Sequence, residues 1–145
     1  MKDFKAYFII SAEPELVYQA LTQPATIQLW TGEAAEMSAE PGSEFSLWSG
    51  SISGRNLEFI PGKVIKQQWY FGAQEAASIV TIKLHADKKG TSIEIRQTNI
   101  PDEDYDNITS GWKENYTEPF KSFITNSRYF ISRFSMLLPS KKASN

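Results

Sequence analysis

Cysteine is absent from the 145 residues of this chain, and histidine occurs once. Without cysteine the chain has no disulfide, no thiolate metal cluster and no cysteine nucleophile. A single histidine without cysteine also leaves no zinc ligand set. We therefore expect neither a metal nor another cofactor, and the thiol enzymes are excluded as a class.

An excess of positive charge is also absent, because 15 Lys and Arg stand against 17 Asp and Glu, for a net charge of -2. Proteins that bind nucleic acid by neutralising phosphates usually carry a strongly basic surface. Long apolar runs that could span a membrane are missing, and the N-terminus has no apolar signal segment. We therefore expect a cytoplasmic protein with no nucleic-acid partner and no membrane span.

What the chain does contain is a high proportion of aromatic residues, 13%, within a hydrophobic fraction of 41%. This composition and this length favour one folded domain with one apolar core. We expect that domain to cover residues 1–138. Residues 139–145 are rich in serine and lysine and are expected to form a flexible polar tail.

The hydrophobic pattern predicts seven strands. In the first, Phe4, Ala6, Phe8 and Ile10 share one face at a period of two. Turns containing glycine or proline then separate short segments that are rich in β-branched and aromatic residues. The predicted strands are residues 4–10, 33–39, 44–48, 51–60, 64–71, 78–86 and 91–98.

Helical spacing occurs in three places. Two short helices, each with a proline in its first turn, are predicted after the first strand, at residues 14–21 and 24–30. From Ile108 onward, apolar residues recur at intervals of three or four over roughly thirty residues. This pattern predicts one long C-terminal helix, with a bend or a short break at Pro119.

The second half of that helix carries two adjacent apolar stripes with a spacing of seven residues. The stripes are Phe123, Phe130 and Leu137, and Ile124, Ile131 and Leu138. One stripe can face the sheet, and an exposed second stripe would form a surface for a partner or a second copy of the chain. Deeper burial of the helix explains the pattern equally well.

The order of these elements predicts an α+β fold. A curved antiparallel sheet of seven strands would wrap around the long C-terminal helix, with the two short helices at one end. Wherever sheet and helix side chains fail to meet, such a fold leaves an apolar pocket.

Several segments resemble a known family. Residues 45–69 are similar to the middle of the domain found at the C-terminus of the activator of the 90-kDa heat-shock chaperone ATPase. Within residues 111–121, the Gly-Trp pair, the tyrosine and the Pro-Phe-Lys sequence resemble its C-terminal helix, and residues 20–30 resemble its helix pair. The resemblance covers nearly the whole chain. It implies the helix-grip fold of the START-like (SRPBCC) superfamily, which includes birch-pollen-allergen, polyketide-cyclase and lipid-transfer proteins.

Catalytic residues are harder to find. His85 lies, by parity, on the face of its strand opposite Val80, Ile82 and Leu84, and so we expect it to point to solvent. No glycine-rich phosphate motif precedes a predicted helix. We therefore assign no catalytic residue, and the sequence favours a protein that is not an enzyme.

The aromatic residues are the best candidates for a binding site, although ordinary core packing is the alternative for each of them. Gln97 and Asn99 share parity with Ile93 and Ile95 and are expected to face inward, where their amides could bind a ligand, water or backbone. The expected ligand-binding residues are Trp30, Trp48, Trp69, Gln97, Asn99, Trp112, Tyr116 and Phe120.

These observations lead to one main hypothesis and two alternatives. The main hypothesis is non-enzymatic binding of a small hydrophobic or amphipathic molecule in a cavity between the sheet and the C-terminal helix. The family resemblance implies the first alternative, an interaction module that modulates the ATPase of a 90-kDa heat-shock chaperone. The second alternative is a cyclase-like enzyme. The expected partners are accordingly a small hydrophobic molecule, a chaperone or a second copy of this chain.

Overall fold

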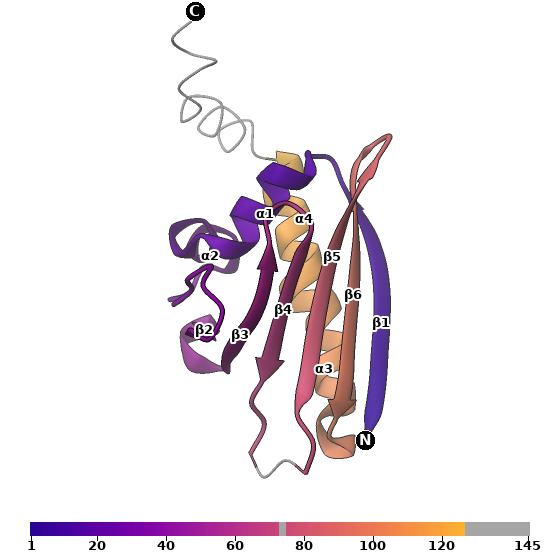
Figure 1. Cartoon of the computed structure of the whole chain (residues 1–145). Coiled ribbons are helices and arrows are strands. Elements are labelled where there is room, and N and C mark those ends of the chain that lie inside the picture. The colour runs from indigo at the N-terminus through magenta and orange to yellow at the C-terminus, as the bar shows by residue number, and fades with distance from the viewer. Residues whose placement is uncertain (73–74, 127–145) are drawn as a thin grey trace, which may run out of the picture.

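The computed structural model describes residues 1–72 and 75–126, which form an α+β fold with one antiparallel sheet and a C-terminal helix (Figure 1). The strand order across the sheet is β1-β6-β5-β4-β3-β2. The first strand therefore pairs with the last one. The strands are β1 (Lys2–Ile10), β2 (Glu44–Leu47), β3 (Ile52–Ile60), β4 (Val64–Trp69), β5 (Ser78–Asp87) and β6 (Gly90–Ile100).

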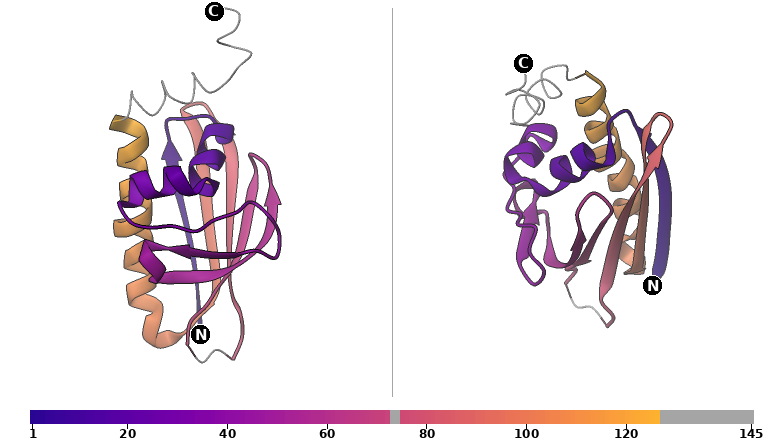
Figure 2. Two further views of the ribbon diagram at one scale, coloured as in Figure 1. Left: turned by 90° about the vertical axis from the view of Figure 1, so that its left-hand side faces the viewer. Right: turned by 45° about the horizontal axis from the view of Figure 1, so that its top comes forward.

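Two short helices follow β1, as the sequence predicted. They are α1 (Pro14–Thr22) and α2 (Pro24–Thr31), and each begins at a proline. Proline suits this position because its fixed φ is helical and its missing N–H would have no partner in a first turn. The two helices cover one end of the sheet, beside the end of the C-terminal helix (Figure 2).

The C-terminal helix contains a π-helical turn. It begins as α3 (Tyr105–Gly111), widens at Trp112–Thr117 and continues as α4 (Glu118–Asn126). In the wide turn the backbone N–H of Glu118 donates to the carbonyl of Lys113, five residues earlier. The next residue is Pro119, which has no N–H and whose ring would press on the preceding turn of a regular α-helix. The helix therefore accommodates this proline with a π turn rather than a break.

The π turn also explains why one row of side chains stays buried. Ile108, Trp112, Tyr116, Phe120 and Ile124 follow one another every four residues; the first is half-buried and the others are buried. In a regular α-helix each four-residue step overshoots a full turn by about 40°, so such a row would wind away from the sheet. A turn with five-residue hydrogen bonds has less rotation per residue, and it keeps the row facing the sheet.

The sheet formed by residues 1–72 and 75–126 has six strands, so the prediction of seven is wrong. Residues 33–39 form no strand and contribute a single antiparallel bridge, Glu36 with Ser46, beside the edge strand β2. Alanine and glutamate dominate this segment, and both are poor strand formers. Only Met37 in it is buried, so no alternating face holds the segment against the core.

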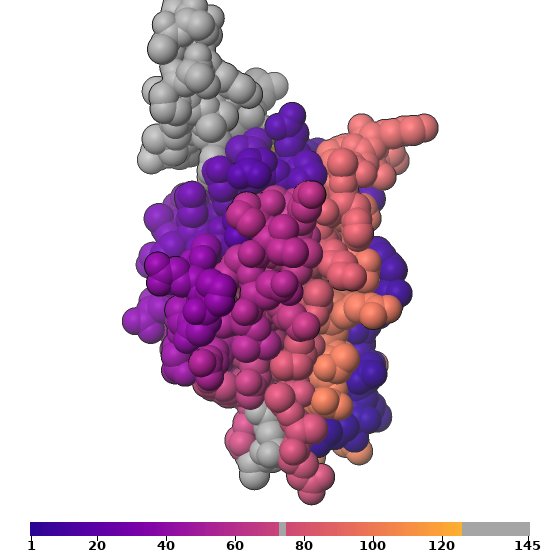
Figure 3. Space-filling model, viewed as in Figure 1, coloured from indigo at the N-terminus to yellow at the C-terminus, as the bar shows by residue number. Residues whose placement is uncertain are grey.

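The core lies between the helix and the face of the sheet that the helix covers (Figure 2). On the central strands, Ile82 and Ile95 are buried beneath the helix, whereas Lys83 and Arg96 lie on the opposite, exposed face. Figure 3 shows this outer face of the sheet. The predicted alternation of apolar and polar residues in β5 and β6 is confirmed.

Two predictions concern residues that the structure does not describe. The apolar stripes beyond Asn126, with Phe130, Ile131, Leu137 and Leu138, lie outside the described residues, as does the predicted tail over 139–145. Among the residues that are described, no helix combines the length and the apolar character needed to cross a membrane.

Candidate ligand-binding site

A cavity of about 440 Å³ lies between the first half of the C-terminal helix and the ends of β3 and β4. The helix supplies one wall, and residues 48–52 with Trp69 supply the other. The lining residues are Glu33, Trp48, Ser51, Ile52, Trp69, Asn107, Ile108, Gly111, Trp112, Asn115 and Tyr116. The cavity thus joins segments from the N-terminal, central and C-terminal parts of the chain.

Four of the predicted aromatic residues line this cavity together. The rings of Trp69 and Trp112 are stacked, with centroids 4.9 Å apart and an interplanar angle of 19°. Tyr116 lies 4.7 Å from Trp112 and 5.7 Å from Trp48, measured between ring centroids. The four rings therefore form one continuous aromatic wall, which we call the aromatic wall below.

Trp30 and Phe120 lie behind the aromatic wall instead of lining the cavity. The Trp30 ring is 5.0 Å from Tyr116 and 5.3 Å from Phe120, in both cases edge to face. Its indole N–H donates to the Ala20 carbonyl at 3.1 Å, which ties α2 to α1. These two residues are 6% and 0% exposed, so they support the wall from the core.

Gln97 faces inward, as expected from parity, and it bonds to protein groups at both ends of its amide. Its Oε1 accepts a hydrogen bond from the Trp112 indole N–H at 2.7 Å, and its Nε2 donates to the Ser78 hydroxyl at 3.1 Å. The side chain is 0% exposed and does not line the cavity. Gln97 therefore positions the Trp112 ring from behind.

A second glutamine does the same for Trp69, and sequence reasoning missed it. The Trp69 indole N–H donates to Gln67 Oε1 at 3.1 Å, and Gln67 Nε2 donates to Asn56 Oδ1 at 3.0 Å. Both amides are buried. The signal was available, because Gln67 has the same parity in β4 as Ile65 and Trp69. A buried glutamine therefore fixes each ring of the stacked pair.

Asn99 does not face inward, so that expectation is wrong. The backbone φ of Asn99 is 53°. Lys2 pairs with Ile100 and Phe4 pairs with Gln97, so two residues of β6 lie opposite the single residue Asp3 of β1. This bulge breaks the parity. The Asn99 amide donates to the Ala77 carbonyl at 3.0 Å, outside the cavity, and Ile100 takes the buried position.

The polar part of the lining was also missed. Asn107, Gly111 and Asn115 repeat every four residues along the helix, next to the aromatic row. This second four-residue repeat is the feature of the sequence that could have predicted the polar lining. Glu33, which is exposed, and Ser51 complete the polar lining.

Trp48 is held in an unusual backbone conformation. Trp48 and Ser49 have φ values of 51° and 54°, a left-handed region that costs a residue other than glycine about 1–2 kcal/mol. The half-buried Trp48 ring packs against Trp30 and Tyr116, and the Ser49 N–H donates to the Ala34 carbonyl at 3.0 Å. These contacts hold the strained turn over the cavity.

The charge around the cavity is low. Glu33 supplies a carboxylate, and the described lining residues include no Lys, Arg or His. Burial raises the pKa of the Tyr116 phenol well above its ordinary value, so this residue is an uncharged hydrogen-bond donor at neutral pH. Within residues 1–72 and 75–126, no cluster of His, Asp and Glu could hold a metal ion.

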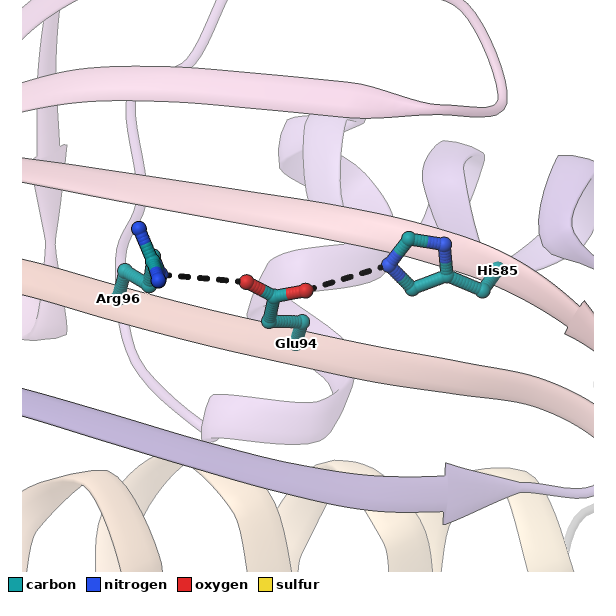
Figure 4. A network of polar contacts seen from close by, with 3 residues as sticks. All are labelled: His85, Glu94 and Arg96. Atoms are coloured by element: carbon teal, nitrogen blue, oxygen red, sulfur yellow. Dashed lines mark hydrogen bonds and ion pairs between the residues drawn. The ribbon is translucent and has the colours of Figure 1, made fainter.

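His85 lies far from this chemistry, on the outer face of the sheet. Its Nε2 is 3.3 Å from Glu94 Oε1, and Arg96 Nε is 3.3 Å from Glu94 Oε2 (Figure 4). The His85 and Arg96 side chains are each 54% exposed. The predicted exposure of His85 is confirmed, and the network is an ordinary surface one.

The sequence and the fold both match known proteins. The family model described as "Activator of Hsp90 ATPase homolog 1-like protein" matches residues 11–124. A curated relative from Dictyostelium discoideum, named activator of 90 kDa heat shock protein ATPase homolog, is 32% identical over 121 residues, which are 81% of this chain. The match spans 32% of that relative's own length.

Solved structures agree with the fold. The structure of PFC0360w, described as an HSP90 activator from Plasmodium falciparum, superposes with a TM-score of 0.72 at 25% identity, covering 79% of this chain and 90% of that one. The solution structure described as the Aha1 dimer from Colwellia psychrerythraea gives a TM-score of 0.75 at 18% identity, with coverages of 86% and 96%.

Proposed function

The chain belongs to the family of Activator of Hsp90 ATPase homolog 1-like proteins, and within this family we propose that it binds a small hydrophobic or amphipathic molecule without catalysing a reaction on it. The observation that carries this proposal is the cavity of about 440 Å³ with its aromatic wall. Ligand pockets in proteins typically measure about 300–1,000 Å³ and are lined mainly by apolar and aromatic groups with a few polar ones.

The way the wall is built supports the proposal. Buried Gln67 accepts a hydrogen bond from the Trp69 indole N–H, and buried Gln97 accepts one from the Trp112 indole N–H. The part of each indole left to contact a ligand is therefore apolar. Holding aromatic rings in place before a ligand arrives lowers the entropic cost of binding. The strained turn at Trp48 and Ser49 also fits a binding role, because such backbone strain is concentrated at functional sites.

Replacing Trp48 with alanine is expected to weaken binding of the uncharged dye Nile red by about tenfold or more, because a large ring is removed from the cavity lining. Trp48 is only half-buried, so the variant should remain folded. The dissociation constant would be measured by dye fluorescence, and folding by thermal denaturation followed by circular dichroism.

The matched control is Tyr7→Ala, which removes a 58% exposed aromatic side chain from the outer face of the sheet. This variant should bind Nile red as the unchanged protein does. Equal dissociation constants for Trp48→Ala, Tyr7→Ala and the unchanged protein would exclude the cavity as the binding site.

A second function, modulation of the ATPase of a 90-kDa heat-shock chaperone, is favoured by one specific observation. The Dictyostelium relative, 32% identical over 121 residues, is named as a homologue of an activator of that ATPase. If this chain acts in the same way, adding it to purified 90-kDa chaperone should raise the rate of ATP hydrolysis with a saturable dependence on its concentration. An unchanged rate at saturating protein would rule the function out.

A further inference from the structure

The Tyr116 hydroxyl differs from the polar groups of the other buried rings around the cavity, those of Trp30, Trp69 and Trp112. The half-buried Trp48 indole N–H also makes no hydrogen bond with a residue in 1–72 or 75–126. The indole N–H groups of Trp30, Trp69 and Trp112 each donate to a protein oxygen. Tyr116 lines the cavity and is 6% exposed, yet its hydroxyl makes no hydrogen bond with any residue in 1–72 or 75–126. A buried hydroxyl without a partner is energetically unfavourable.

The other lining groups restrict what could approach this hydroxyl. Glu33 contributes a negative charge, and the described lining contains no cationic side chain that could pair with an anion. Burying an unpaired negative charge is strongly unfavourable. Fatty acids and other carboxylates therefore fit the cavity poorly.

The shape of the wall restricts the ligand further. The Trp69 and Trp112 rings stack on each other, and the Tyr116 ring is tilted by 47° to Trp112 and by 55° to Trp48, so the lining offers ring faces and edges in several orientations. Aromatic rings gain stabilisation from face and edge contacts with other rings beyond what the buried area alone provides. A planar molecule benefits from this surface more than a flexible chain, which would also lose conformational freedom on binding.

We propose that the ligand is an uncharged aromatic molecule carrying a hydrogen-bond acceptor, and that the Tyr116 hydroxyl donates to this acceptor. The inference rests on the proposed binding function and identifies the chemical class of its ligand. The acceptor atom of the ligand completes the hydrogen bonding of the Tyr116 hydroxyl, which is the one polar group among the buried rings of Trp30, Trp69, Trp112 and Tyr116 without a partner in the described residues.

The test compares three probes of similar size: 2-acetylnaphthalene, 2-ethylnaphthalene and 2-naphthoate. The first is uncharged and has a carbonyl acceptor, the second lacks the acceptor, and the third is an anion. Dissociation constants would be measured by equilibrium dialysis against the full chain. We expect 2-acetylnaphthalene to bind about tenfold more tightly than either of the other two, the difference a single hydrogen bond provides.

The decisive variant is Tyr116→Phe, which removes only the hydroxyl and leaves the ring in place. It should reduce the ratio between 2-ethylnaphthalene and 2-acetylnaphthalene dissociation constants from about tenfold to near one. Tyr70→Phe is the control, because its hydroxyl bonds to Glu44 at the surface, outside the cavity. That control should keep the tenfold ratio.

The possible failures are distinguishable. If none of the three probes binds, both the binding function and this inference are wrong. If the probes bind but Tyr116→Phe keeps the preference of the unchanged protein, or if no preference exists, the binding function stands and the role of Tyr116 is wrong. If 2-naphthoate binds as tightly as 2-acetylnaphthalene, the assignment of an uncharged ligand is overturned.

Discussion

Replacing Gly54 with alanine is expected to lower the free energy of unfolding by more than about 3 kcal/mol. Gly54 is buried in β3, where it pairs with Phe45 of β2 on one side and with Trp69 of β4 on the other. An added Cβ would overlap the backbone carbonyl oxygen of Gln68 and would lie 2.8 Å and 2.9 Å from two atoms of the Phe45 ring.

This clash is severe because the carbonyl belongs to the paired strand and moves only if the β3–β4 pairing opens. Since Trp69 is the residue opposite Gly54, the same opening displaces half of the stacked indole pair. Urea denaturation would measure the loss, and the thermal midpoint should fall by roughly 10 °C in a domain of this size.

Gly72→Ala is the matched control for this prediction. Among the described residues other than its chain neighbours, no atom lies within 4 Å of a Cβ built at position 72. Its free energy of unfolding should change by less than about 0.5 kcal/mol. If the two variants proved equally stable, the close approach of β3 and β4 would not be what excludes a side chain at position 54.

Replacing Phe120 with alanine is expected to cost about 3–5 kcal/mol of stability. The Phe120 ring is 0% exposed and packs edge to face on Trp30, behind the aromatic wall. Its removal leaves a void between α2 and α4 and takes away the support for Trp30 and, through it, Tyr116. Binding of Nile red should therefore weaken too, although Phe120 does not line the cavity.

Two further variants test whether this effect comes from the void. Phe120→Leu keeps most of the volume and should cost less than half as much as Phe120→Ala. Leu29→Ala removes a side chain on α2 that is 64% exposed, and its effect should be below about 0.5 kcal/mol. A cost for Phe120→Ala no larger than for Leu29→Ala would show that this part of the core is not tightly packed.

Much of the fold was predictable from the sequence because its signals are local. In a strand, successive side chains point to opposite faces, so the pattern of β5 and β6 could be recognised without knowing their neighbours. Prolines Pro14 and Pro24 mark helix starts through their own geometry. All six strands were predicted to within two residues at each end, and the one wrongly predicted strand was residues 33–39.

The places where prediction failed depend on contacts between distant segments. Asn99 follows the inward parity of Gln97 until a bulge, formed against β1, turns it away. Residues 33–39 contain only one buried side chain, and they are held by one bridge to Ser46 and by separate hydrogen bonds, such as that from the Ser49 N–H to the Ala34 carbonyl, instead of by a strand ladder. The π turn is an intermediate case, since two local features of the sequence, Pro119 and the four-residue apolar repeat before it, both indicate this turn.

The sequence by itself determined the class of fold, the family and a set of aromatic residues near the C-terminal helix. Tertiary structure alone decided that Trp48, Trp69, Trp112 and Tyr116 line a cavity while Trp30 and Phe120 support it. It also decided which buried polar groups form hydrogen bonds with other groups of the protein. The physical reason is that periodicity is set by the backbone of a single segment. The hydrogen-bond partner of a buried group depends instead on how different strands and helices pack together, as with Gln97 of β6 and Trp112 of the helix.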